Sequence, residues 1–313
     1  MNRVGGCPPP WTDDAVLSMH RFTNAYRASD RVSQFLIQKV LYCGEQSPEE
    51  IFFRAMLFKI FNRIDTWETI SKALGPPRWK TFSYEKYARV LDQIMSRGKT
   101  LYSAAYIMPS PAFGNPRKHR NHLSLIEFMM SERAPLRIAK APSLKAAFEL
   151  LRGFPSIGNF LAFQFAIDLN YSTITDFLEN QFVVAGPGAR DGIKKCFVDT
   201  AGLDDAAVIY TVTEMAQSEF KRLGLEFQTL WGRPLQPIDC QNLFCEVDKY
   251  SRVVHPEYRG NTGRTRIKQK FSVNGLPLPQ WYPPKWGIKL TLPAPAKEKI
   301  AWLPPTQIPL DIT

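Results

Sequence analysis

The sequence predicts an all-α fold, and three observations support that prediction. Apolar residues recur with helical spacing through the first two-thirds of the 313 residues, and glycine and proline separate the periodic stretches. Strand signals are few, because the patch Phe182-Val183-Val184 is too short to build a sheet. We expect a helical domain over residues 13–251, an N-terminal extension over 1–12 and a basic, proline-rich C-terminal tail over 252–313.

Most of the expected helices have a recognisable start or stop. Ser29 or Asp30 is suited to cap the first helix, which Gly44 would end. The run Ser47-Pro48-Glu49-Glu50 predicts a capping box that opens a buried helix over 51–64. A polar loop is expected over 108–121, with His119 and His122 solvated. The remaining helices are expected at 65–74, 83–97, 123–131, 143–152, 159–169, 190–199, 204–223 and 237–251.

Charge and cysteine content narrow the class of protein. Lysine and arginine number 40 against 29 acidic residues, a net charge of +11 that suits a polyanionic partner, usually nucleic acid. A merely basic soluble protein is the alternative. The five scattered cysteines predict neither disulfides nor a zinc site, and no metal or cofactor is expected. Without an apolar signal core or a membrane-spanning run, we expect a cytoplasmic protein with no membrane partner.

Two glycine-containing turns each lead into a helix N-terminus, where backbone N–H groups can bind a phosphate. The first follows a helix that ends near Arg152, and its candidate DNA-binding residues are Ser156, Ile157, Gly158 and Asn159. The second runs from Phe182 to Phe197, and its candidates are Gly186, Gly188, Lys194 and Lys195. A plain connection between helices is the alternative for both turns.

A polar stripe is expected on the helix over 237–251. Asp239, Asn242, Glu246 and Lys249 follow one another at helical spacing, with Leu243, Phe244, Val247 and Tyr250 on a buried side. Carboxylates and amides on one face can supply charge and hydrogen bonds to a base, so Gln241 and Asn242, with Asn62, are candidates for base recognition. A solvated helix face is the alternative.

Two catalytic signatures are absent from the sequence. The only Gly-Lys-Thr, at 98–100, lacks the glycine five residues earlier that a P-loop requires, because Gln93 stands there. Phosphoryl transfer from ATP on this chain alone is therefore not expected. The zinc deaminase signature is also missing.

Several segments together resemble a known family, over about residues 15–255. They are Arg21 to Arg27, Phe58 to Arg63, Asp168 to Ser172, Phe182 to Gly188 and Asp239 to Lys249. They are similar to the α-glutamyl/putrescinyl thymine pyrophosphorylase relatives, which include the helical domain named after hydroxymethyluracil DNA kinase. The resemblance implies a two-lobed fold of the helix-hairpin-helix DNA glycosylase superfamily, one phage-defence member of which removes glucosylated hydroxymethylcytosine.

The resemblance implies a glycosylase that flips a hypermodified pyrimidine out of double-stranded phage DNA and excises it, in antiviral defence. The best guess for the base is α-glucosyl-hydroxymethylcytosine, and no protein partner is expected. Catalysis is assigned first to Asp176, eighteen residues after Gly158, and then to Asp239 or Glu246. Ser156 replaces the usual hairpin glycine, and no lysine follows the hairpin, which implies a monofunctional hydrolase that leaves abasic sites. The alternatives are a transferase or pyrophosphorylase that modifies hydroxymethylpyrimidines in DNA, and a non-catalytic DNA-binding module.

Overall fold

The computed structural model describes residues 12–272 and 278–289, and within these ranges it is all-α, as predicted. The α-helices are α1 (Ala15–Met19), α2 (Arg31–Phe35), α3 (Pro48–Phe61), α4 (Ile64–Leu74), α5 (Tyr84–Ser96), α6 (Lys118–Ser131), α7 (Ala134–Ala139), α8 (Leu144–Arg152), α9 (Asn159–Asn170), α10 (Pro187–Cys196), α11 (Asp205–Arg222) and α12 (Pro237–Val254). A π-helical segment, η2 (Leu36–Leu41), continues α2, and four 3-10 turns complete the elements, η1 (Arg27–Ser29), η3 (Trp79–Thr81), η4 (Glu179–Gln181) and η5 (Pro284–Trp286).

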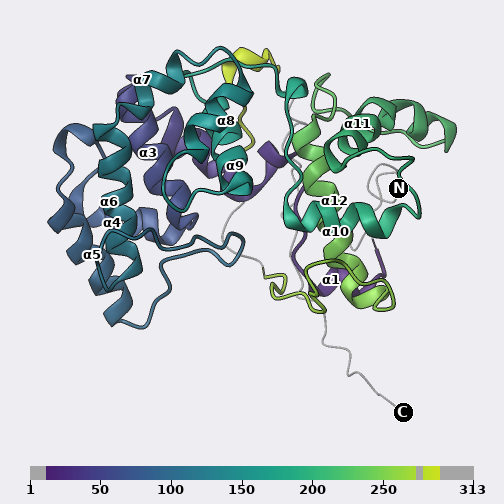
Figure 1. Ribbon diagram of the computed structural model, residues 1–313, viewed down its shortest axis with the longest axis horizontal. Coiled ribbons are helices and arrows are strands. Elements are labelled where there is room, and N and C mark those ends of the chain that lie inside the picture. Colours follow the sequence, from purple (N-terminus) through teal and green to yellow (C-terminus); the bar gives the residue numbers. More distant parts are fainter. Residues whose placement is uncertain (1–11, 273–277, 290–313) are drawn as a thin grey trace, which may run out of the picture.

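The helices form two lobes (Figure 1). One lobe contains α3 to α9, and the other contains α10 to α12 together with α1. The N-terminal segment belongs to the second lobe because it binds α12. The Tyr250 hydroxyl donates to Asp14 at 2.5 Å, and Lys249 Nζ donates to the Arg21 carbonyl at 2.8 Å. The described residues therefore begin on the second lobe, form the first lobe and then continue into the second lobe again.

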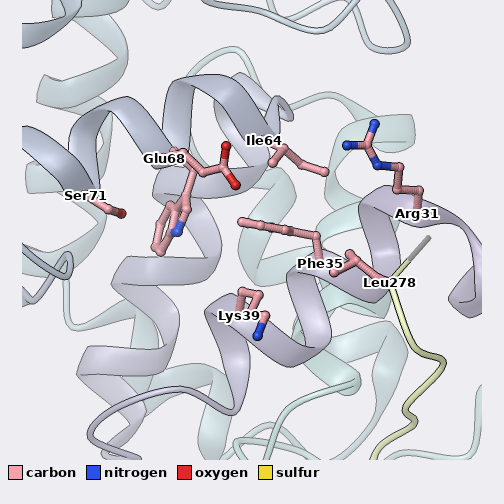
Figure 2. Close-up of a pocket in the computed structure, with 8 residues that line it drawn as sticks. Arg31, Phe35, Lys39, Ile64, Glu68, Ser71 and Leu278 are labelled. Atoms are coloured by element: carbon pink, nitrogen blue, oxygen red, sulfur yellow. The ribbon is translucent and has the colours of Figure 1, made fainter. Parts of the chain in front are cut away.

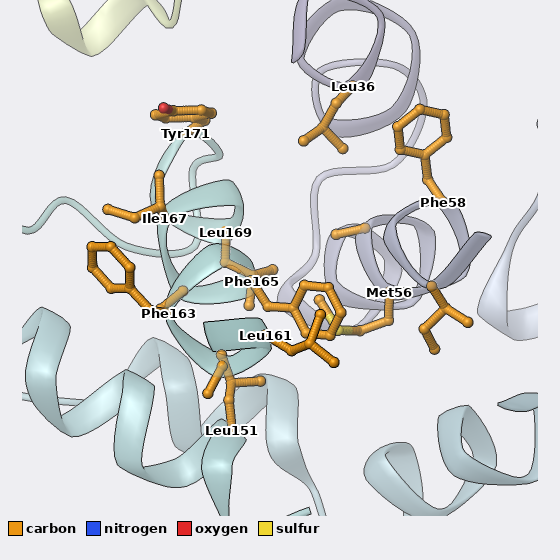
Figure 3. Packing of buried hydrophobic residues seen from close by; sticks show 14 of the residues in the cluster. Leu36, Met56, Phe58, Leu151, Leu161, Phe163, Phe165, Ile167, Leu169 and Tyr171 are labelled. Atoms are coloured by element: carbon orange, nitrogen blue, oxygen red, sulfur yellow. The ribbon is translucent and has the colours of Figure 1, made fainter. Parts of the chain in front are cut away.

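The core of the first lobe is built around α3 and α9. Every residue from Glu50 to Phe61 on α3, and every residue from Leu161 to Asn170 on α9, is buried. Figure 3 shows Phe165 and Leu161 of α9 directed towards Met56 of α3. A helix that is apolar on all sides requires cover on all sides, so α4 to α8 and η2 surround this pair.

Several local predictions were wrong in detail. The capping box before α3 does not form: Ser47 makes no side-chain cap, and Glu50 instead accepts from the backbone N–H groups of Trp79 and Lys80 at 2.9 and 3.0 Å. The loop predicted over 108–121 ends early because α6 begins at Lys118. His119 and His122 are therefore buried rather than solvated.

The C-terminal residues that the structure describes pack on both lobes. We call residues 278–289 the C-terminal strap. The Trp281 N–H donates to Gln34 Oε1 at 2.8 Å in the first lobe. The Arg233 guanidinium, which precedes α12, lies over the Trp286 ring at 4.0 Å. The predicted extension 1–12 falls, except for Thr12, outside the described residues, and so does 290–313 of the predicted tail. None of the helices seen here has the length and apolar character of a membrane span.

Candidate functional site

The turn between α8 and α9 has the geometry of an anion site. Buried Ile157 anchors the turn in the core, while Gly158 and Asn159 are exposed. Ser156 has φ 62°, the left-handed conformation that favours glycine. No side chain caps α9, so its first N–H groups have no side-chain cap as a partner. A Cβ on Gly158 would meet nothing within 4 Å, so glycine there leaves room for a group from outside.

The second predicted turn lies beside the first. Gly186 precedes α10, which begins at Pro187 and is also without a side-chain cap. A Cβ on Gly186 would lie 2.6 Å from Cδ2 of Phe160, in the first turn of α9. The two uncapped helix N-termini are thus brought together, although the turns are almost thirty residues apart in sequence. Together they form a candidate phosphate-binding surface.

Only some of the residues predicted on α10 face outward. Lys194 is exposed and donates to Asn261 Oδ1 at 3.1 Å. Lys195 is directed inward, where its Nζ lies 2.8 Å from Asp248 Oδ1 and its side chain is 4% exposed. A Cβ on Gly188 would lie 3.1 Å from the Cys245 sulfur. This side of α10 packs against α12, so the structure places Lys195 and Gly188 in that contact, and their predicted DNA binding stays a prediction.

The polar stripe predicted on α12 is not a solvent-facing surface. Asp239 is buried and accepts from the N–H groups of Arg27 at 2.8 Å and Gln236 at 2.9 Å. Burial raises its pKa to about 7, despite these two hydrogen bonds. Glu246 Oε2 lies 2.5 Å from Lys249 Nζ and accepts from the Thr23 N–H at 3.2 Å. Both carboxylates thus hold the N-terminal segment on α12, and their predicted catalytic role stays a prediction.

The buried face of α12 also differs from the prediction. Val247, which we expected in the core, is 39% exposed, whereas Asp248 and Gln241 are 1% and 0% exposed. Gln241 is enclosed between the lobes, and Asn242 is half-buried. The reason is that α10 covers the face of α12 that carries Gln241, Cys245 and Asp248.

A buried polar network joins the lobes at its centre. Asp168 of α9 lies 2.7 Å from Arg27 Nη2 and 3.2 Å from Lys59 Nζ, and all three side chains are at most 4% exposed. Lys59 also donates to Asn62 Oδ1 at 2.9 Å. Asn62, a predicted base reader, therefore lies in the interior, where it ends α3 with φ 48°.

Gln164 extends the network across to the second lobe. Its Oε1 accepts from Arg27 Nε at 3.2 Å and from the Tyr106 hydroxyl at 3.3 Å, and its Nε2 donates to Gln241 Oε1 at 3.2 Å. Gln241 in turn contacts the Cys245 sulfur at 3.1 Å. Chains of this kind in a low-dielectric interior fix the relative position of the groups that they connect.

Sequence analysis gave no role to Arg27, Lys59, Gln164 or Asp168. For Lys59 and Asp168, the sequence did contain a signal that could have indicated a buried charge. Lys59, with Arg54, is a charged residue in the apolar run of α3, and Asp168 is the charged residue in the apolar run of α9. A buried charge needs a partner of opposite sign.

Asp176 is the predicted carboxylate that faces solvent. Its side chain is 80% exposed, and Lys285 Nζ of the strap lies 3.6 Å from Oδ1. The same ammonium donates to the carbonyls of Asn170 at 2.5 Å, Ser172 at 2.9 Å and Thr175. One half-buried cation therefore holds the loop that presents Asp176.

Two surface cavities of the described residues lie away from the α9 N-terminus. One, of about 470 Å³, opens on the first lobe between α2, η2 and α4 (Figure 2). None of the predicted site residues contributes to it; its lining is Arg31, Phe35, Lys39, Ile64, Trp67, Glu68, Ser71 and Leu278. A second, of about 440 Å³, lies at the end of α10 and includes Lys194 and Asn261.

Fold and site together define a basic, two-lobed, all-helical protein with a candidate nucleic-acid interface at two helix N-termini. Residues 1–260 match the model of the family described as "5-hmdU DNA kinase, helical domain", and the chain belongs to that family. It is similar to the 5-hmdU DNA kinase of Bacillus phage SP10, with 28% identity over 268 residues. That match covers 79% of this chain and 41% of the phage protein, so the chain spans about two-fifths of its relative. No solved structure matches.

These comparisons correct the expected activity. The resemblance to the hydroxymethyluracil DNA kinase helical domain is confirmed, but the expected glycosylase was wrong. The curated relative is a DNA kinase, which is a transferase and not a base-excising hydrolase. Excision of glucosylated hydroxymethylcytosine, abasic-site formation and the defence role that depended on them are not supported.

Proposed function

We propose that this chain binds double-stranded DNA and recognises a hydroxymethylated pyrimidine in it, as the DNA-recognising part of a transferase that acts on the hydroxymethyl group. The observation that carries the proposal is the family match over residues 1–260, since the relative is named for a hydroxymethylated deoxyuridine in DNA. The adjoining N-termini of α9 and α10 and the net charge of +11 support it physically.

The reaction in a kinase of this type is a phosphoryl transfer. The hydroxymethyl oxygen attacks the phosphorus of a donor, its proton passes to a base, and the leaving group departs with the electrons of the broken P–O bond. Because the sequence contains no P-loop, we assign to these residues the binding and orientation of the DNA, and not the binding of a nucleotide donor.

Among the three predicted carboxylates, we assign the proton-accepting role to Asp176. Asp239 uses both oxygens within the fold, and Glu246 is paired with Lys249. Asp176 is 80% exposed and is held in place through the Lys285 loop contacts, so a substrate hydroxyl can reach it. A positioned carboxylate of this kind acts as a general base.

Recognition of the base is assigned to the interlobe region. Asn242 is half-buried on α12 and is the amide that we propose contacts the base. Gln241 and Asn62 are enclosed in the polar network, and we propose that they position the two lobes around the target nucleotide.

The test is a binding measurement with matched duplexes that differ at one position, which carries hydroxymethyldeoxyuridine, thymidine or deoxycytidine. Fluorescence anisotropy is expected to show preferential binding of the hydroxymethylated duplex. Gly158→Ala and Gly158→Val are expected to weaken binding progressively, because a side chain would obstruct the α9 N-terminus without a clash in the protein. Equal affinity for all three duplexes would refute recognition of the modified base, and unchanged binding by Gly158→Val would remove the hairpin from the interface.

A further inference from the structure

One segment of the second lobe concentrates positive charge without compensation. We call residues 259–270 the basic arm. It carries five cations and no carboxylate, namely Arg259, Arg264, Arg266, Lys268 and Lys270. All five are exposed, and none makes an ion pair with the part of the chain that the structure describes. Many other surface cations here have acidic partners, so the arm differs from an ordinary charged surface.

The basic arm is fixed at its first end by α10. Asp191, which is 1% exposed, accepts from the N–H groups of Asn261 at 2.7 Å and Thr262 at 3.2 Å, and also from the Thr262 hydroxyl. Gly260 permits this contact, because a Cβ there would lie 2.3 Å from Cγ of Asp191. Lys194 of α10 adds a hydrogen bond to Asn261.

The other end of the arm is fixed by the N-terminal segment. The Arg21 N–H donates to the Gln269 carbonyl at 3.1 Å, and the Phe271 N–H donates to the Met19 carbonyl at 2.9 Å. Ile267 is 9% exposed and anchors the middle of the arm. A segment held at both ends presents Arg264, Arg266 and Lys268 at defined positions, which lowers the entropy that binding would cost.

We propose that the basic arm is a second DNA-contact surface that binds the phosphodiester backbone beside the target nucleotide. Five like charges held near one another repel, and regularly spaced phosphates relieve that repulsion while releasing counterions. The arm is continuous with the first surface, since it is bonded to α10, whose N-terminus lies against α9. From Pro187 to Lys194 the rise along α10 is roughly 10 Å, about three base-pair steps. This inference rests on the proposed function.

The experiment removes three arm cations and compares them with three cations elsewhere. The arm variant is Arg264→Gln/Arg266→Gln/Lys268→Gln. The matched control is Lys72→Gln/Lys86→Gln/Arg89→Gln, on α4 and α5, where the three side chains are also exposed and make no ion pair. Both variants lose the same net charge. Affinity for hydroxymethylated and unmodified duplexes is measured by anisotropy from roughly 50 to 200 mM salt.

The arm variant is expected to bind both duplexes at least about tenfold more weakly. The negative slope of log affinity against log salt should become shallower by about 3. The ratio between the duplexes should stay unchanged, because phosphate contacts carry no base information. Equal affinities and slopes for the arm and control variants would overturn the arm proposal. That outcome is distinct from failure of the proposed function, in which the wild-type protein itself shows no preference for the hydroxymethylated duplex.

Discussion

Asp168→Asn should destabilise this protein more than any surface charge change. The substitution keeps the size of the side chain but removes the negative charge that lies 2.7 Å from Arg27 Nη2 and 3.2 Å from Lys59 Nζ. Both cations then remain buried without a counter-charge. Removing one partner of a buried ion pair costs on the order of 3–5 kcal/mol, and two stranded cations place this case towards the upper end. At roughly 2 °C for each kcal/mol in a chain of this size, the melting temperature should fall by about 10 °C.

The assay is urea unfolding followed by circular dichroism, with Asp65→Asn as the matched control. Asp65 also pairs with an arginine at 2.7 Å, Arg63, but it is 71% exposed, so its loss should cost less than about 1 kcal/mol. Adding Lys59→Met to Asp168→Asn should recover part of the loss, because one stranded cation is removed. A destabilisation by Asp168→Asn as small as that of the control would refute the reasoning that the triad is an electrostatic unit.

Four further outcomes are expected. In a phosphate-incorporation assay that includes the donor-binding part of the transferase, Asp176→Asn should retain DNA binding but lower transfer to the hydroxymethyl group by roughly 100-fold or more; wild-type rates would exclude it as the base. Burial lowers the pKa of His122 to about 4, below its unfolded value of 6.5. The free energy of unfolding, measured by urea titration, should therefore fall by about 3 kcal/mol as the pH is lowered from 6.5 to 4. His122→Gln should abolish this pH dependence. Burial raises the pKa of Asp239 to about 7, so the pH dependence of its contribution to folding stability should be opposite to that of His122. That contribution is fully present below pH 3.8 and is lost as the pH rises through 7. Asp239→Asn should remove this decline. Ser156→Gly should raise the free energy of unfolding by about 0.5 kcal/mol or more, because glycine adopts a positive φ without strain. No gain in urea unfolding would contradict this expectation.

The helices could be predicted because their signals are local. Ser143 and Asp204 cap α8 and α11 with their side chains, and glycine or proline separates most of the other helices. The misplaced start of α6 has a tertiary cause. His119, the second residue after Arg117, is buried against Asp92 of α5 at 2.7 Å, and His122 is buried against the Tyr102 hydroxyl at 2.7 Å. A basic, histidine-rich run predicts a loop until its partners on other elements are known.

The candidate site could be predicted only where backbone geometry defines it. Ser156 to Asn159 form the expected turn because proline and glycine specify it locally. Carboxylates on α12 could not be sorted in the same way, since their exposure depends on what covers the helix. Asp239 and Glu246 have the spacing of a polar face, yet the N-terminal segment, more than two hundred residues away in sequence, occupies both.

The glycines of α10 show how one pattern serves two purposes. Gly186 and Gly188 suggested a phosphate loop, but a Cβ on Gly188 would press on Cys245. A Cβ on Gly192, further along α10, would lie 2.0 Å from the Phe244 carbonyl oxygen. These glycines let α10 approach α12 so closely that Lys195 forms an ion pair with Asp248. Lys194 lies on another side of α10, where it is exposed and bonds Asn261. The Phe160 ring of α9 packs against Gly186 at the start of α10, so close packing also brings together the two turns of the proposed anion-binding surface. In that proposal the glycines act through packing, and not by contacting phosphate themselves.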